Sequence, residues 1–286
     1  MKKIGLLILS LITVLILTGC GQTKEKTITV VGSSAVQPLA ESASEIYSEQ
    51  NKGVYINVQG GGTGTGLSQI QSGAVDIGNS DLFAQEKKGI DAKQLVDYKI
   101  CVVGIVPVVN KDLKIKNLTL TQLRKIFAGQ ITNWQDVGGP NLPITIINRA
   151  SGSGTRSVFE KSVMNNLETK KSQEQDSSGM VRQIIANTPG SISYLAMPYI
   201  NSDVKTLKVD GHEATKQNIV DNKWTIWSYE HMYIQKNGDP LAKEFIDFIL
   251  SKHVQKNVVE KMRYIPISEM NYQKDDHGKT TKIGGK

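Results

Sequence analysis

Short apolar runs alternate with amphipathic segments along the first third of this 286-residue sequence, and this alternation constrains the fold most strongly. Residues 27–31 and 54–58 have the composition of strands, whereas residues 36–49 place apolar side chains on one helical face. A short helical stretch at 67–71 leads to another strand at 75–78. Because a helix between successive strands joins them in parallel, the pattern predicts an α/β fold.

The same pattern restarts after the long apolar stretch that ends near Asn110. The later predicted helices are 119–128, 154–164, 240–250 and 254–262, and the later predicted strands are 144–148, 191–195 and 229–235. The sequence therefore predicts two α/β lobes in one compact body, each a mixed sheet flanked by helices. We expect residues 27–108 plus 234–272 in one lobe and residues 109–233 in the other, with crossings near 106–110 and near Tyr233.

The N-terminal residues have the form of an export signal. Two lysines precede an apolar run from residue 4 to residue 17, which is shorter than the ~20 residues of a membrane-spanning helix. Residues 1–19 are therefore interpreted as a signal peptide. The sequence Leu17-Thr18-Gly19-Cys20 resembles the lipobox of bacterial lipoproteins, which implies a lipid on the Cys20 thiol and a lipidated linker at 20–26. The alternative is an ordinary secretory leader with a chance cysteine.

Composition excludes several classes of protein. With 39% hydrophobic and 21% charged residues the chain is neither disordered, collagenous nor a coiled coil. Two cysteines and four scattered histidines provide no disulfide framework and no zinc-ligand spacing, so neither a metal nor a cofactor is expected. The net charge of +7 suits an anionic partner, but the three tryptophans are not interleaved with arginine clusters, so nucleic acid is not expected.

The composition around Cys101 and of residues 273–286 predicts how each of these two segments behaves. Cys101 lies in an apolar stretch with no histidine nearby in the sequence, and it is expected to be a buried small hydrophobe rather than a nucleophile. Residues 273–286 are polar apart from Ile283, and we expect them to form a mobile tail.

Three motifs place glycine and small hydroxyl residues where a strand meets a helix. They are Gly32-Ser33-Ser34-Ala35, the glycine-rich loop 60–66 and Arg149-Ala150-Ser151-Gly152-Ser153-Gly154-Thr155. Free N–H groups at a helix start favour an anion, and an arginine adds a bidentate donor. Each motif alone is better explained by a helix cap or a turn, but the three together favour a site for a tetrahedral oxyanion.

Asp81 is an acid close to these motifs, at the end of Asp76-Ile77-Gly78-Asn79-Ser80-Asp81. An ionised carboxylate can accept the proton that hydrogen phosphate carries, whereas it would repel sulfate, which has no proton at neutral pH. Asp81 could therefore select phosphate over sulfate. A helix cap or turn residue is the alternative interpretation.

Together these motifs, in this order and spacing, resemble the phosphate-binding proteins of high-affinity ABC-type phosphate importers, in their lipoprotein form. The resemblance covers residues 27 to about 272. It implies a two-lobed periplasmic-binding-protein-like fold of type II with phosphate in the cleft between the lobes. It also implies a monomer, held by its lipid on the outer face of the cytoplasmic membrane, that passes phosphate to the permease and ATPase subunits of an importer.

The resemblance assigns a contact to each matching residue. Ser34 and Thr63 would donate through their hydroxyls and Ala35 through its backbone N–H, while Asp81 would accept and Arg149 would supply a charged fork. Ser153, Gly154 and Thr155 would complete the shell at a helix start. Relatives often carry an acid two residues after the arginine, where this chain has Ser151, so another group could orient the guanidinium.

Two other kinds of function are left open by the residues. A hydrolase acting on phosphoesters could use the same glycines and serines. However, the loop 60–66 lacks the Lys-Ser/Thr of a P-loop, no GxSxG elbow surrounds Ser153, and no histidine is an evident base. We therefore expect a binding protein rather than an enzyme. A surface protein with a role in adhesion or signalling is the other alternative.

Overall fold

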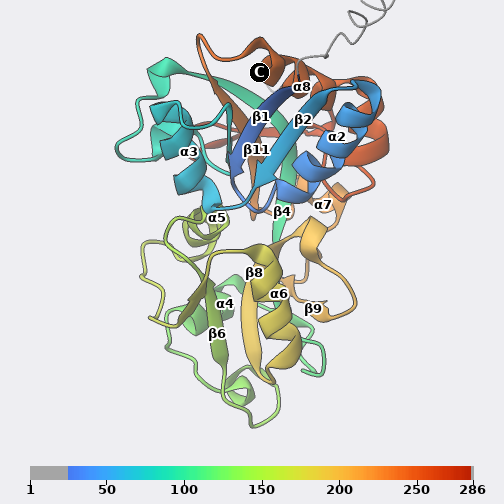
Figure 1. The fold of residues 1–286 in the computed structure, drawn as a ribbon. Coiled ribbons are helices and arrows are strands. Elements are labelled where there is room, and N and C mark those ends of the chain that lie inside the picture. Colours follow the sequence, from blue (N-terminus) through green and yellow to red (C-terminus); the bar gives the residue numbers. More distant parts are fainter. Residues whose placement is uncertain (1–24, 285–286) are drawn as a thin grey trace, which may run out of the picture.

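The computed structural model describes residues 25–284, in which two α/β lobes lie one above the other (Figure 1). The predicted signal peptide and Cys20 lie outside the described residues. None of the helices in residues 25–284 has the length and apolarity that crossing a bilayer requires.

The first lobe is built on a mixed sheet with the strand order β2–β1–β3–β11–β4. Its strands are β1 (Lys26–Gly32), β2 (Val54–Gln59), β3 (Ile77–Ser80), β11 (Trp227–Gln235) and the first part of β4 (Leu95–Asn110). Strand β1 pairs in parallel with β2 and β3, as the alternation of strands and helices predicts. Strand β11 runs antiparallel between β3 and β4, which makes the sheet mixed.

Three helices cover this sheet: α2 (Gln37–Gln50), α3 (Gly62–Ser72) and α8 (Pro240–Leu250). Pro38 lies in the first turn of α2, where its missing N–H costs no hydrogen bond. Leu39, Ala43 and Tyr47 recur along one side of α2 and are buried against the apolar side of α8, where Tyr47 meets Phe245 edge to face. This packing brings the C-terminal part of the chain back onto the first lobe.

The second lobe contains the rest of the nine-stranded path, β4–β8–β6–β7, with β9 beside β4. Its elements are β6 (Thr145–Arg149), β7 (Gln173–Gln175), β8 (Ser191–Ala196), β9 (Val204–Thr206), α4 (Leu120–Phe127), α5 (Gly154–Val163), α6 (Ser178–Asn187), α7 (Lys216–Val220) and the two-stranded sheet of β5 (Asn117–Leu118) and β10 (Lys208–Val209). Phe127, Phe159 and Tyr194 form the aromatic centre of its core, with the last two rings stacked at 4.0 Å. The prediction of an α/β fold with a mixed sheet in each lobe is confirmed.

Strand β4 belongs to both lobes. Its residues up to Gly104 pair with β11, and its residues from Ile105 onward pair with β8 and β9. The chain returns next to this crossing, where the Trp224 indole N–H donates to the carbonyls of Ile105 (3.2 Å) and Ile226 (3.0 Å). We therefore propose that the first crossing lies at Gly104–Ile105 rather than near 106–110, and that the return crossing lies just before Trp227 rather than near Tyr233.

The segment predicted as a glycine-rich loop at 60–66 is instead the start of a helix. Gly61 and Gly62 have φ values of +147° and +82°, which allow the chain to turn sharply after β2. Helix α3 then begins at Gly62, five residues before the predicted helical stretch at 67–71. Because glycine has a low helix propensity, the sequence pattern concealed these first turns.

The C-terminal region also differs from its prediction. The helix expected at 254–262 is a short helix, α9 (Lys252–Val254), followed by the π-helical segment Gln255–Val259. The tail expected to be mobile forms a hairpin of β12 (Tyr272–Lys274) and β13 (Thr280–Lys282). Lys274 ties this hairpin to the return crossing, since its ammonium donates to the carbonyls of Thr225 (3.1 Å) and Trp227 (2.7 Å) and lies 4.0 Å from the Trp227 ring centroid.

Gly66 provides a test of how closely α3 packs on the sheet. A Cβ atom at this position would lie 2.6 Å from the Asn79 carbonyl oxygen and 2.8 Å from the Gly32 Cα and the Val31 carbonyl oxygen, all of which are backbone atoms. Gly66→Ala should therefore lower the free energy of unfolding by about 1–3 kcal/mol or more, measured by urea denaturation. Gly64→Ala is the matched control, because its Cβ would have ordinary contacts at 3.4–3.5 Å. Equal midpoints for the two variants would contradict this account of the packing.

Candidate functional site

The starts of three helices meet where the two lobes touch. Ser34 and Ala35 lie in the turn before α2, Thr63 lies in the first turn of α3, and Gly154 and Thr155 open α5. The ends of α3 and α5 face one another across the junction (Figure 1), and the Gly64 N–H donates to the Gly152 carbonyl at 3.0 Å. The eight residues that the sequence predicted for the site are all buried here: Ser34, Ala35, Thr63, Asp81, Arg149, Ser153, Gly154 and Thr155.

Arg149 is the charged centre of this junction and is only 1% exposed. It ends β6 in the second lobe, yet its Nη2 donates to the Ser34 hydroxyl of the first lobe at 3.0 Å. Its Nη1 donates to the Ser178 hydroxyl at 2.9 Å. Burial lowers the pKa of Arg149, and the nearby negative charge of Asp81 opposes this shift.

Asp81 receives hydrogen bonds from both lobes. Its Oδ2 accepts from the Thr155 hydroxyl at 2.6 Å, and its Oδ1 accepts from the Thr63 hydroxyl at a longer 3.5 Å. Thr63 in turn accepts from the Asp81 backbone N–H at 3.0 Å. Asp81 therefore lies among hydroxyl donors, within the electrostatic influence of Arg149.

Two of the predicted donors already have partners in the structure. The Ala35 N–H donates to the Ser33 Oγ at 3.0 Å, so donation from Ala35 to a ligand would require this bond to be exchanged. Ser153 caps α5, because its Oγ accepts from the Arg156 N–H at 3.2 Å. Its own hydroxyl hydrogen can still be donated, so the cap and a ligand contact are compatible.

Ser178 is a residue of this cluster that the sequence analysis missed. It begins α6, and its hydroxyl lies 3.1 Å from the Ser34 hydroxyl across the lobe junction. The signal was present, because Ser177, Ser178 and Gly179 form another run of small residues at a helix start. The helix itself was not predicted, so the run carried no positional information.

The orientation of Arg149 does not depend on residue 151. Ser151 is exposed. The guanidinium is held instead by two backbone carbonyls of the segment that leads from β7 into α6. Arg149 Nε donates to the Gln175 carbonyl at 3.2 Å, and Nη2 donates to the Asp176 carbonyl at 2.6 Å. Carbonyls that replace a paired acid leave the full positive charge of the guanidinium in the cluster.

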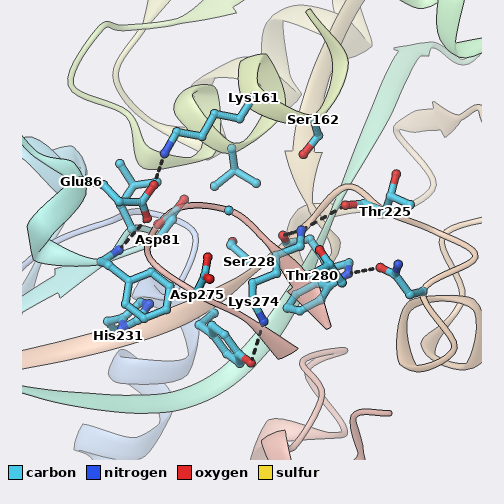
Figure 2. A pocket seen from close by; sticks show the side chains of 17 residues that line it. Asp81, Glu86, Lys161, Ser162, Thr225, Ser228, His231, Lys274, Asp275 and Thr280 are labelled. Atoms are coloured by element: carbon cyan, nitrogen blue, oxygen red, sulfur yellow. Dashed lines mark hydrogen bonds and ion pairs between the residues drawn. The ribbon is translucent and has the colours of Figure 1, made fainter. Parts of the chain in front are cut away.

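A cavity of about 250 Å³ lies beside this cluster, between the lobes and the C-terminal hairpin (Figure 2). Lys161 and Glu86, which form an ion pair between the lobes, lie on one side, and Lys274 lies on the other. Of the predicted site residues, Asp81 alone lines it. The cavity therefore meets the donor cluster at Asp81, and the other predicted site residues do not line it.

Other candidate chemistry is located away from this junction. Cys101 is fully buried in β4, and burial raises the pKa of its thiol. Among the residues that the structure describes, no group of three or more acidic, histidine or cysteine side chains could hold a metal ion. His231 is also buried, and its Nδ1 lies 2.7 Å from the Asp97 carboxylate.

Comparisons with known proteins agree with this architecture. A model described as the PBP superfamily domain matches residues 20–253. The phosphate-binding protein PstS of Bacillus subtilis is 45% identical over 253 residues, which are 88% of this chain and 84% of that protein.

Solved structures with the same fold include two proteins whose descriptions name phosphate transport. One is from Clostridium perfringens, described as a phosphate ABC transporter substrate-binding protein with bound phosphate; the TM-score is 0.79 with 31% identity, covering 85% of this chain and all of that one. The other is an ABC-type phosphate transport receptor from Vibrio cholerae, with a TM-score of 0.66 and 27% identity over 83% of this chain and 99% of that one.

These similarities confirm the two-lobed fold of type II and the resemblance that the motifs indicated. The superfamily model spans most of the chain, and the identity to the Bacillus subtilis protein extends over nearly all of the described residues. The chain therefore belongs to the PBP superfamily and, within it, to the family of the phosphate-binding protein PstS.

Proposed function

We propose that this protein is an extracytoplasmic receptor that binds inorganic phosphate between its lobes and delivers it to an ABC importer. One observation carries the proposal: a buried cluster of hydroxyl and guanidinium donors, drawn from both lobes, surrounds a single acid that accepts from two of them. The relatives named as phosphate-binding proteins and the Clostridium perfringens structure with bound phosphate support the same ligand.

The donor set suits a tetrahedral oxyanion that retains a proton. Arg149 would pair with the negative oxygens. The Ser34 and Ser178 hydroxyls would exchange their mutual contact, and the Thr155 hydroxyl its bond to Asp81, for bonds to the ligand. Asp81 would accept the proton of hydrogen phosphate, whereas sulfate would place an oxygen lone pair against the carboxylate. The cluster thus combines attraction to any oxyanion with rejection of those that lack a proton.

Binding would favour closure of the lobes because neither lobe holds a complete donor set. Ser34, Thr63 and Asp81 belong to the first lobe, while Arg149 and Thr155 belong to the second. A ligand that makes its full set of contacts only in the closed arrangement stabilises that arrangement. We propose that the hinge consists of the β4 crossing near Gly104–Ile105 and the return crossing before Trp227.

The proposal does not require catalysis. The relatives are named as binding and transport proteins, and among the described residues no histidine forms a hydrogen bond with Ser153 or with another member of the cluster. We propose that the protein is not an enzyme and acts as a monomer whose closed form is recognised by the permease of the importer. A phosphoester hydrolase remains the alternative to this proposal.

Anchoring to the membrane through Cys20 is a separate part of the proposal. If the Leu17–Cys20 sequence directs lipidation, the wild-type protein should partition into the detergent phase of a cell extract and Cys20→Ser should not. Cys101→Ser is the matched control, because that thiol is buried in the first lobe. A wild-type protein found in the aqueous phase would contradict lipid anchoring and leave phosphate binding unaffected.

The ligand can be tested by isothermal titration of the mature chain at fixed pH. Phosphate should bind tightly, arsenate should compete because it also carries a proton, and sulfate should bind at least 10⁴-fold more weakly. The same preparation should leave a chromogenic phosphate ester intact. Absence of phosphate binding would contradict the proposed function, and turnover of the ester that is lost in Ser153→Ala would favour a hydrolase.

The Asp81→Asn variant serves as the internal test of this selectivity. An amide can donate as well as accept, so the variant should weaken phosphate binding by about tenfold and reduce discrimination against sulfate by about 100-fold or more. Asp76→Asn is the control, because Asp76 accepts from the Thr29 N–H at 2.8 Å outside the cluster. Unchanged discrimination in Asp81→Asn would exclude Asp81 from the proposed role.

The importance of the charge can be tested by ranking single deletions. Arg149→Ala should weaken phosphate binding by 100-fold or more, and Ser34→Ala, Thr155→Ala or Ser178→Ala by about tenfold each, since charge-assisted bonds are roughly twice as strong as neutral ones. Arg124→Ala is the control, because Arg124 donates to the Val163 carbonyl elsewhere in the second lobe. A hydroxyl deletion that weakens phosphate binding more than Arg149→Ala, measured by titration, would contradict this ranking.

A further inference from the structure

Glu230 is a buried acid that the proposed phosphate contacts do not use. It lies on β11 with 0% exposure, and neither of its carboxyl oxygens accepts a hydrogen bond from a donor within residues 25–284. A carboxylate cannot remain ionised in such a place without a donor or a cation, because the loss of hydration is not compensated. Glu230 is therefore expected to be protonated, and its carboxylic O–H is expected to donate to a nearby acceptor.

The strand register identifies that acceptor as Asp81. In the antiparallel pair of β11 and β3, Met232 is opposite Asn79 and His231 is opposite Ser80. The pairing ends at Ser80, and the next residues of the two segments are Glu230 and Asp81. If the antiparallel register continues by one residue, their side chains lie about 5 Å apart at the Cβ atoms and point to the same side. Consistent with this placement, the negative charge of Asp81 raises the pKa of Glu230.

The surroundings decide which of the two acids carries the proton. Asp81 accepts from the hydroxyls of Thr63 and Thr155, and these bonds stabilise its ionised form. Glu230 has no such donors, since the guanidinium of Arg149 donates to serine hydroxyls and backbone carbonyls instead. Two carboxyl groups in contact away from water cannot both be ionised, so the proton belongs on Glu230.

The other titratable groups around Glu230 do not change this assignment. They are Cys101, which is opposite Glu230 on β4, and the phenols of Tyr199 and Tyr264. All are neutral at physiological pH, because burial raises the pKa of each of them. Burial also raises the pKa of Glu230 well above its usual value, and the negative charge of Asp81 raises it further.

We propose that Glu230 is a positioning residue that donates its carboxylic proton to Asp81, and thereby keeps Asp81 an ionised, acceptor-only group facing the ligand. This role rests on the proposed function, since it concerns how Asp81 distinguishes a ligand that carries a proton from one that does not. Both acids belong to the first lobe, so the pair exists before the lobes close. Without this donor, Asp81 would lose one of the hydrogen bonds that hold its carboxylate as an acceptor facing the ligand.

Two substitutions of Glu230 separate donation from packing. Glu230→Gln keeps a donor at this position and should retain discrimination between phosphate and sulfate within about threefold of the wild type. Glu230→Leu fills similar space without a donor, and its discrimination should fall by about tenfold or more, in the direction of Asp81→Asn. Cys101→Ala is the matched control, because it changes packing directly opposite Glu230 and leaves the acid pair intact. Equal discrimination in Glu230→Leu and the wild type would overturn the proposal.

Infrared spectroscopy tests the shared proton independently of ligand affinity. The wild-type chain at pH 7, without ligand, should show the carbonyl stretch of a protonated carboxylic acid, and Glu230→Gln should lack it. A wild type without this band, or a band that persists in Glu230→Gln, would overturn the proposal even if Glu230→Leu failed to fold. If the wild type did not bind phosphate, the proposed function would fail while this measurement would still decide whether the acid pair exists.

Discussion

The buried guanidinium of Arg149 is the interaction on which the arrangement of the lobes depends. Taking an arginine side chain to 1% exposure costs several kcal/mol unless each of its donors finds an acceptor. The second lobe satisfies part of this need with the carbonyls of Gln175 and Asp176, and the first lobe contributes the hydroxyl of Ser34. The lobes therefore meet around a charge that neither of them satisfies alone.

The strand shared by the two lobes forms the connection about which the proposed closure would occur. Strand β4 is continuous through both sheets, and the returning chain is fixed beside it by the Trp224 indole. The C-terminal hairpin adds a tie through Lys274 to the same crossing. Because the described chain passes between the lobes at these two crossings, opening would alter contacts at the helix starts and leave each sheet intact.

The two lobes supply different parts of the proposed recognition. The second lobe brings positive charge, which attracts any oxyanion, whereas the first lobe brings Asp81, which distinguishes ligands by their proton. With Glu230 beside it on the same sheet, Asp81 would be prepared for this task before the ligand arrives. Thr155 of the second lobe reaches Asp81 across the junction, so this acid contacts both lobes.

Much of the fold was predictable because its strands and helices follow simple local patterns. The parallel pairing of β1 with β2 and β3, and the span of α8, were as expected. The first turns of α3 were not recognised because their glycines conceal a helix. The C-terminal hairpin was not recognised because the contacts that hold it to the rest of the fold, such as those of Lys274, are distant in the sequence. Local periodicity reports which face of an element is apolar, and it reports nothing about a polar segment held by remote carbonyls.

The sequence by itself determined the class of the site: small hydroxyl residues and glycines at strand-to-helix junctions, an arginine and one acid, whose chemistry follows from residue type. All of these residues do come together in the structure. Only the tertiary structure brought Ser178 into the cluster and gave the Arg149 guanidinium backbone carbonyls as acceptors in place of an acid at position 151. It also placed Glu230 on the strand that pairs with β3, next to Asp81. The physical reason is that donors and acceptors are paired by strand register and lobe contact, and both join residues far apart in the chain.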